Sequence, residues 1–311
     1  MASPLSTRRR LGEIRASREL VLKISKIMVP VDFSSNSLLA TRHAAILAKR
    51  FRAKMTLVHV HEITVFHPLN GALGYGTPSQ ESIRNALIVN RRKELDAFAA
   101  EELAGLNVDR EVHCGDIAQI IVERAQRENV DLIVMPTHGC GPTRRLLLGS
   151  ITAKVLHDSD RVIWTTRPSS ESPRDPAQVR NVMCAVNFRC NDKQIVQWAA
   201  GFAAEYGAHL TLVHAILATP LELPERYAFT WHAEAQMGAD ERLRCLLLEA
   251  RVPAEVLVIT GDPPTALGLA AKERSADVLV IGRSHATNMI GRLGSRTYGI
   301  ICHSPCSVVT V

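Results

Sequence analysis

The sequence predicts an α/β protein made of two tandem open five-stranded parallel sheets, each in the strand order 3-2-1-4-5 with helices on both faces. Two observations lead to this fold class. Short apolar, β-rich runs alternate with stretches of helical periodicity, and the whole alternation occurs twice in the 311-residue chain. Alternating strands and helices form βαβ units, and these units make parallel sheets that helices cover on both faces.

An internal repeat shows how the two copies correspond. Residues 27–60 align without a gap to residues 182–215, an offset of 155, and both contain the block TLVH. Further along, DLIV at 131–134 matches DVLV at 277–280, where the offset is 146. The second copy is therefore nine residues shorter. The loss falls in the connection after TLVH, which has the Gly and Pro content of a loop.

Each copy contains five β-rich runs in the same order. In the first copy we expect strands at 26–31, 54–60, 108–113, 130–136 and 161–166. Helical periodicity fills the intervals at 36–52, 81–104, 116–128 and 150–157. In the second copy we expect strands near 181–187, 208–214, 254–259, 277–282 and 306–311.

The composition divides the chain into four parts. The stretch RPSSESPRDPAQ is rich in Pro, Ser and charge, as linkers are, and we place a linker at 168–178. It separates a first domain at 27–167 from a second domain at 179–311. Residues 1–26 are predicted to be a basic tail, with seven Arg or Lys against two Glu, a net +5 of the +6 for the whole chain.

The charge and cysteine patterns argue against several classes of protein. The predicted domains are close to neutral, so we expect no nucleic-acid groove; the tail could touch an anionic membrane or partner, or remain a solvated arm. No apolar run approaches the ~18 residues that span a bilayer, and we expect no secretory signal. Seven scattered cysteines without a C-x-x-C pair favour reduced thiols and a cytoplasmic protein.

A candidate ligand site lies where the first and fourth strands of the first copy end. In an open parallel sheet, ligands bind beyond the carboxyl ends of the strands, where the strand order reverses. Asp32 ends the first strand, with Ser35 or Asn36 available to cap the next helix, and Gly139 follows the fourth strand. Glycine there lets the backbone approach a ligand. Asp32 could accept hydrogen bonds from a ribose or a base, or it could stabilise its own turn.

The end of the same loop has the features of a phosphate cradle. Gly149 stands just before a predicted helix, and Ser150 is a good N-cap. The first-turn amides point outward at the positive end of the helix dipole, which favours an anion: Ser150, Ile151 and Thr152. Arg144 and Arg145 could reach terminal phosphates, or they could form a solvated loop face. Neither a Walker A loop nor G-x-G-x-x-G occurs.

These segments resemble the universal stress protein (UspA-like) family. The resemblance rests on IMVPVDFS, TLVHV and above all MPTHG…RLLLGSITAKVL, and it covers nearly the whole chain as two tandem Rossmann-like domains. Nucleotide-binding members of the family carry G-x2-G-x9-G-[S/T] after the fourth strand. Gly139, residues 140–148 and Gly149-Ser150 fit that pattern, while Pro136 replaces the first glycine, which removes an amide but keeps the loop length.

The resemblance implies a stress-response or regulatory protein that binds an adenine nucleotide, ATP with or without Mg²⁺, in the first domain. Adenine and ribose would be held by Asp32 and the backbone near Pro30, Val31 and Val58. The remaining implied binding residues lie in the loop and at the start of the helix: Pro136, His138, Gly139, Gly149, Ser150, Ile151 and Thr152. His138 could touch the ligand or simply be exposed.

Two other functions have to be weighed against nucleotide binding. The main alternative is a partner-binding scaffold of the same fold without a nucleotide. An enzyme is not expected, because S-G-G-x-D-S and H-I-G-H-like motifs are absent and no base is placed near a nucleophile. We assign no catalytic residue, and slow ATP hydrolysis is the most activity we expect.

The second copy departs from the pattern at both ends of its site. Asn187 replaces Asp32, His285 stands where a glycine is needed, and eight residues instead of nine precede Gly294-Ser295. We therefore expect no nucleotide in the second domain, which would serve as a built-in pseudo-dimer partner. In the competing hypothesis, arginine side chains restore phosphate binding there: Arg283, Arg292 and Arg296.

The final strand of each copy and one histidine of each copy have expected structural roles. RVIWTT and CSVVTV are apolar, so we expect them to meet at the interdomain interface, and self-association between chains could use the same strands. His59 and His214 are expected to be hydrogen-bonded structural residues, and no metal site is expected.

Overall fold

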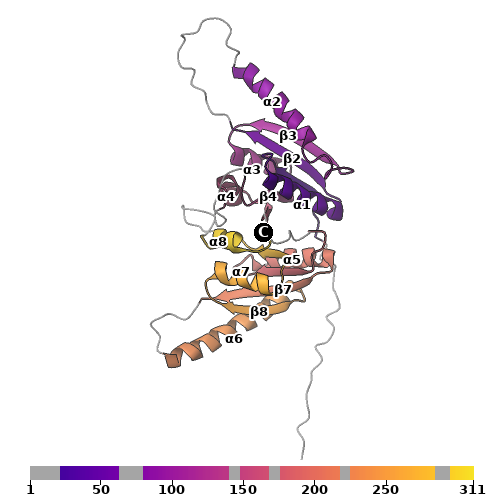
Figure 1. Cartoon of the computed structure of the whole chain (residues 1–311). Helices are drawn as coiled ribbons and strands as arrows, with labels where there is room; N and C mark the ends of the chain where they lie inside the picture. The colour runs from indigo at the N-terminus through magenta and orange to yellow at the C-terminus, as the bar shows by residue number, and fades with distance from the viewer. Residues whose placement is uncertain (1–21, 63–79, 140–147, 168–175, 218–224, 284–294) are drawn as a thin grey trace, which may run out of the picture.

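The computed structural model describes residues 22–62, 80–139, 148–167, 176–217, 225–283 and 295–311. These residues form two lobes, with α2 and α6 at opposite ends of the molecule and the C-terminus near its centre (Figure 1). We call β1 to β5 with their helices the first repeat, and β6 to β10 with theirs the second repeat. The limits of the two domains remain a proposal.

Strands and helices alternate along the first repeat. Its elements are β1 Lys26–Pro30, α1 Ser35–Phe51, β2 Lys54–His61, α2 Gln80–Ala97, β3 Val108–Cys114, α3 Ile117–Arg127, β4 Leu132–Pro136, α4 Ser150–Asp158 and β5 Val162–Thr166. The second repeat has the same order. Its elements are β6 Asn181–Ala185, α5 Asp192–Tyr206, β7 His209–Ile216, α6 Glu225–Ala250, β8 Glu255–Thr260, α7 Pro263–Glu273, β9 Val278–Ile281, α8 Ser295–His303 and β10 Ser307–Thr310.

Two boundaries differ from the sequence expectation for identifiable reasons. Helix α2 ends at Ala97 and does not reach residue 104, and Ala99 has a left-handed backbone (φ 53°) that is incompatible with a continuing helix. At the start, the fold begins before residue 27. Ile24 is buried in the core, and the Ser25 amide donates to Oδ2 of Asp131 over 2.7 Å.

The described strands form one continuous ten-stranded sheet in the order β3-β2-β1-β4-β5-β10-β9-β6-β7-β8. Each repeat has the predicted order 3-2-1-4-5, and neighbouring strands within a repeat are parallel. The two predicted sheets are halves of a single sheet, because β5 and β10 pair antiparallel with Trp164 opposite Val309. The expectation that the final strands meet is confirmed, and each covers the apolar edge of the other.

A hydrophobic layer lies on each face of this sheet and runs through both repeats. Side chains alternate along a strand, so Ile27 and Val29 of β1 enter one layer and Met28 enters the other. Helices α1, α2, α5 and α6 close the first layer, and α3, α4, α7 and α8 close the second. The repeats therefore share their core across the β5–β10 junction.

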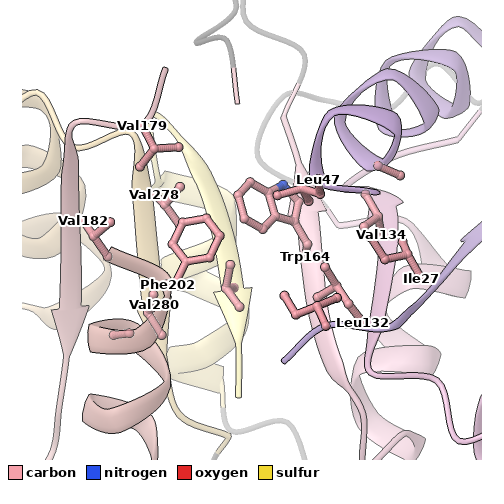
Figure 2. Packing of buried hydrophobic residues seen from close by; sticks show 14 of the residues in the cluster. Ile27, Leu47, Leu132, Val134, Trp164, Val179, Val182, Phe202, Val278 and Val280 are labelled. Atoms are coloured by element: carbon pink, nitrogen blue, oxygen red, sulfur yellow. The ribbon is translucent and has the colours of Figure 1, made fainter. Parts of the chain in front are cut away.

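The junction is packed with aromatic side chains. Figure 2 shows the Trp164 indole of β5 and the Phe202 ring of α5 directed toward one another from the two repeats, with ring centroids 5.6 Å apart. At the rim, the Arg50 guanidinium lies over the Tyr206 ring at 4.8 Å and pairs with Glu205 at 3.2 Å. Arg50 and Glu205 are equivalent positions of the repeat, so this pair links matching helices across the junction.

Candidate functional site

The first part of the site is the tight turn after β1. Phe33 has a left-handed backbone (φ 62°), which directs the chain from the strand into α1. The N-cap of α1 is Ser34, whose side chain accepts from the Ser37 amide; the expected caps, Ser35 and Asn36, already lie inside the helix. Asp32 stabilises this turn, because its Oδ1 accepts from the Ser34 amide (3.0 Å) and from the Ser34 hydroxyl.

The turn after β1 meets the loop after β4, as the strand order requires. A Cβ built on Gly139 would lie 2.6 Å from Oδ2 of Asp32, so only a glycine fits at this position without a shift. The Asn36 side-chain amide donates to the carbonyl oxygen of His138 over 3.1 Å. Asp32 and Gly139, more than 100 residues apart in the sequence, thus lie together at the carboxyl edge of the sheet.

The end of the β4–α4 loop returns to the same place. The Gly149 amide donates to the Thr137 carbonyl over 2.8 Å, and a Cβ on Gly149 would lie 3.4 Å from that oxygen. Gly149 itself is the N-cap of α4, with an extended backbone, and Ser150 is the first helical residue; the prediction of Ser150 as N-cap was wrong. The buried Thr152 hydroxyl donates to the Pro136 carbonyl over 2.9 Å, which fixes the helix on the strand end.

The start of α4 offers hydrogen-bond donors. Its N-cap has no side chain and makes no side-chain cap hydrogen bond. The first N–H groups of a helix have no partner within the helix, and they lie at its positive end. Ser150 is exposed and Ile151 is half-buried, so the first turn can be reached from solvent. The site therefore combines amide donors on α4 with a carboxylate acceptor at the end of β1.

The backbone of Val31 has partners within the protein. Its amide donates to the Val58 carbonyl over 2.9 Å, and its carbonyl accepts from Nδ1 of His59 over 2.8 Å. A carbonyl oxygen can accept two hydrogen bonds, so one lone pair of the Val31 oxygen is still available to a ligand. Val58 is buried and pairs with Pro30 in the β1–β2 register.

His59 is the hydrogen-bonded structural residue that the sequence predicts, and His214 repeats its geometry. Nδ1 of His214 donates to the Val186 carbonyl over 2.8 Å, and each imidazole packs on a phenylalanine ring, Phe33 at 4.6 Å or Phe188 at 4.2 Å. Burial lowers the pKa of both histidines, so the neutral ring is favoured. Because a carbonyl only accepts, Nδ1 carries the proton in each ring.

His138 lies in the loop after β4 and is half-buried. Its Nδ1 is 3.0 Å from the Thr137 hydroxyl oxygen. Burial lowers the pKa of His138, and the charge of Arg167 lowers it further, so the imidazole is held neutral. Arg144 and Arg145 lie outside the described residues.

The second repeat is built differently at the equivalent edge. Asn187 occupies the position of Asp32, and the carboxylate that organises the turn belongs to Asp192, which is 2% exposed. Asp192 accepts from the amides of Asn187 (3.2 Å) and Arg189 (2.9 Å), and burial raises its pKa. A Cβ on Gly282, the counterpart of Pro136, would collide with Cδ1 of Ile195. In the first repeat, an alanine stands where Ile195 stands here.

Several residues of these sites were not found from the sequence. The role of Asn36 had a signal, because Asn36 and Asn191 are identical in the two copies. Asp192 and Ile195 had none, since their effect depends on packing under the loop. His285 lies outside the described residues. Among the described residues there is no cluster of three or more His, Cys, Asp or Glu side chains that could hold a metal, and no helix is long and apolar enough to cross a membrane.

Comparison with known proteins gives a consistent picture. The family model described as "Universal stress protein family" matches residues 23–165 and again residues 178–311. A universal stress protein of Methanocaldococcus jannaschii is 31% identical over 153 residues, which is 47% of this chain and 84% of that protein.

Two solved structures are also similar. A universal stress protein from Archaeoglobus fulgidus superposes with a TM-score of 0.64 over 94% of this chain and 97% of its own, at 20% identity, and so has the same fold. A universal stress protein in complex with cAMP is a more distant likeness, with a TM-score of 0.36, 20% identity, and coverage of 43% of this chain and 97% of its own. The two matches of the family model cover most of the sequence, and the chain belongs to the universal stress protein family.

Proposed function

We propose that this protein is a stress-response or regulatory module that binds one adenine nucleotide, ATP, in the first repeat. The observation that carries the proposal is the meeting of Asp32 and Gly139, where a Cβ would lie 2.6 Å from the carboxylate. Because Gly139 has no side chain, its backbone can lie close to the Asp32 carboxylate and stays accessible to a ligand that the carboxylate binds.

The polar groups of the site suit the two ends of a nucleotide. Asp32 accepts hydrogen bonds and suits ribose hydroxyls or an amino group of the base. The first-turn amides of α4 suit phosphate oxygens, because they are donors at the positive end of a helix. The amides of Ser150 and Ile151 would therefore face the phosphates beside Gly149, whereas the Gly149 amide already donates to the Thr137 carbonyl and the Thr152 hydroxyl to the Pro136 carbonyl. Mg²⁺ would bind together with the nucleotide, coordinated by its phosphates.

The second repeat is proposed to hold no nucleotide. Asn187 lacks the charge that makes a carboxylate hydrogen bond roughly twice as strong as a neutral one. Ile195 occupies the space beside Gly282 at the end of β9, and the Asp192 carboxylate is turned inward onto backbone amides. We propose that this repeat, as a domain at 179–311, acts as a built-in dimer partner of the domain at 27–167, with 168–178 as linker.

The test compares the two equivalent positions Asp32 and Asn187. Purified protein is first analysed for co-purified nucleotide, then stripped and titrated with ATP and Mg²⁺ by calorimetry. Asp32→Ala should weaken ATP binding by about 1–3 kcal/mol, because a ligand donor loses its acceptor. The matched variant Asn187→Ala should leave the affinity unchanged. Equal effects of the two variants would contradict the assignment, and a stripped wild-type protein that releases no heat would favour the scaffold function.

A further inference from the structure

The loop of the candidate site is held by a side chain of the other repeat. The amide of Leu148, one residue before Gly149, donates to the Tyr298 hydroxyl of α8 over 2.8 Å. Leu148 is buried, and its amide precedes the first turn of α4. A buried amide without an acceptor is costly, so the hydroxyl determines where this part of the loop can lie.

The Leu148 contact holds the end of the β4–α4 loop, next to the first turn of α4. Gly149 follows directly, and its amide donates to the Thr137 carbonyl on the other side of the loop. Tyr298 is half-buried in α8, and the hydrogen bond gives its hydroxyl a polar partner while the ring packs against neighbouring apolar residues. One hydrogen bond thus connects the middle of α8 to the residue that precedes the N-cap of α4.

The start of the loop is tied to the same helix. The Thr137 amide donates to the Thr166 carbonyl at the end of β5. The next residue, Arg167, donates from Nη1 to the carbonyl of Cys302 over 3.0 Å and also to that of Ser304. Both ends of the β4–α4 loop are therefore hydrogen-bonded, directly or through Thr166 and Arg167, to α8 and the residue that follows it in the second repeat.

The arginine contact is reciprocated, because Arg283 of the second repeat donates to the Ser159 carbonyl, the counterpart of Ser304, but the tyrosine contact runs in one direction only. Helices α4 and α8 both begin with Ser and span nine residues each, so Tyr298 corresponds to Ala153 of α4. Alanine has no hydroxyl, so Ala153 cannot make the equivalent contact with the second repeat. The asymmetry matches the proposed asymmetry of nucleotide binding, although it comes from different residues.

We propose that Tyr298 is a positioning residue for the phosphate-binding loop of the first repeat. The second repeat, through this hydroxyl and the Leu148 amide, preorganises the amides of α4 for the phosphates of the nucleotide. The ligand part of this inference rests on the proposed function. Adenine and ribose lie at the other end of the site and do not depend on the hydroxyl.

The experiment removes a single oxygen atom. Tyr298→Phe keeps the ring and deletes the hydroxyl. The matched control is Thr165→Val, which deletes another buried hydroxyl that joins the repeats, by a 3.0 Å hydrogen bond to the Val308 carbonyl, but does not touch the loop. Each protein is measured in two ways, well below its unfolding temperature: amide hydrogen exchange without ligand, and affinity for ATP and for adenosine.

Tyr298→Phe should speed exchange of the Leu148 amide about fivefold or more and weaken ATP binding about five- to tenfold, the equivalent of one lost buried hydrogen bond. Adenosine affinity should change less than about twofold, and Thr165→Val should change none of these quantities. Unchanged exchange at Leu148, an ATP affinity that is retained, or an equal loss for ATP and adenosine would each overturn the proposal. A wild-type protein that binds no ATP would refute the proposed function, while the exchange measurement would still decide whether Tyr298 positions the loop.

Discussion

The contact between Gly139 and Asp32 makes a prediction that does not depend on any ligand. In Gly139→Ala, the new Cβ would lie 2.6 Å from Oδ2 of Asp32, and the carboxylate or the loop must move by roughly 0.4 Å or more to reach even a very tight contact. Asp32 is held by both Ser34 hydrogen bonds, so the movement strains the turn. The variant should lose about 1–3 kcal/mol of unfolding free energy, as overpacked sites do.

The same substitution should be harmless once Asp32 is removed. Among the described residues, only atoms of the Asp32 side chain lie within 4 Å of the Cβ position, and Gly139 does not have a positive φ. In an Asp32→Ala background, Gly139→Ala should therefore cost nothing, or stabilise by about 0.4–1 kcal/mol through the unfolded chain. The double-mutant cycle should show a coupling energy of about 1–3 kcal/mol.

The assay is urea unfolding of the four ligand-free proteins, followed by far-UV circular dichroism. Gly238→Ala is the control, because a Cβ on this exposed residue of α6 meets nothing within 4 Å. It should stabilise the protein or leave it unchanged. Additive effects of Gly139→Ala and Asp32→Ala would show that the loop does not pack on the carboxylate, and the description of the site would then be wrong.

Two further predictions concern the junction and the histidines. Trp164→Ala should lower the free energy of unfolding in urea by about 3–5 kcal/mol, because Trp164 is 1% exposed in the shared core. The control Trp231→Ala should lower it by less than about 1 kcal/mol, since Trp231 is 37% exposed. Similar losses in the two variants would contradict the packing at the junction. Burial lowers the pKa of His59 and His214 below the ordinary histidine value of about 6.5, so the unfolded chain binds protons more readily and stability should fall as the pH falls below about 6.5. Replacing both by Asn, which retains a donor for the Val31 and Val186 carbonyls, should flatten this dependence of the urea midpoint between pH 7.5 and 5.5; an unchanged slope would refute the assignment.

The repeat made much of the fold predictable. The two copies gave the same alternation of elements, so the strand order and the position of Asp32 opposite Gly139 followed from one topology. The apolar character of RVIWTT and CSVVTV predicted that β5 and β10 would meet. That they pair antiparallel and join two sheets into one depends on how the repeats are oriented, which no pattern within either repeat encodes.

Details that depend on backbone geometry or on contacts between the repeats could not be predicted. The N-caps fell on Ser34 and Gly149 because the chain turns one residue earlier than the side-chain preferences suggest. Ile195 packs against Gly282 of the second repeat, and its spacing in the sequence does not reveal this contact. Tyr298 contacts Leu148 across 150 residues of sequence, and Ala153, its counterpart in the first repeat, gives no indication of the contact.

The central claim is that one nucleotide binds per chain, at the loop of the first repeat. Isothermal titration of nucleotide-free protein with ATP and Mg²⁺ tests it directly. We predict a stoichiometry near one, and complete loss of binding in Gly139→Val, because the larger side chain drives the loop away from Asp32. A stoichiometry near two, with half of the binding retained in Gly139→Val, would show that the second repeat binds nucleotide and would contradict this account.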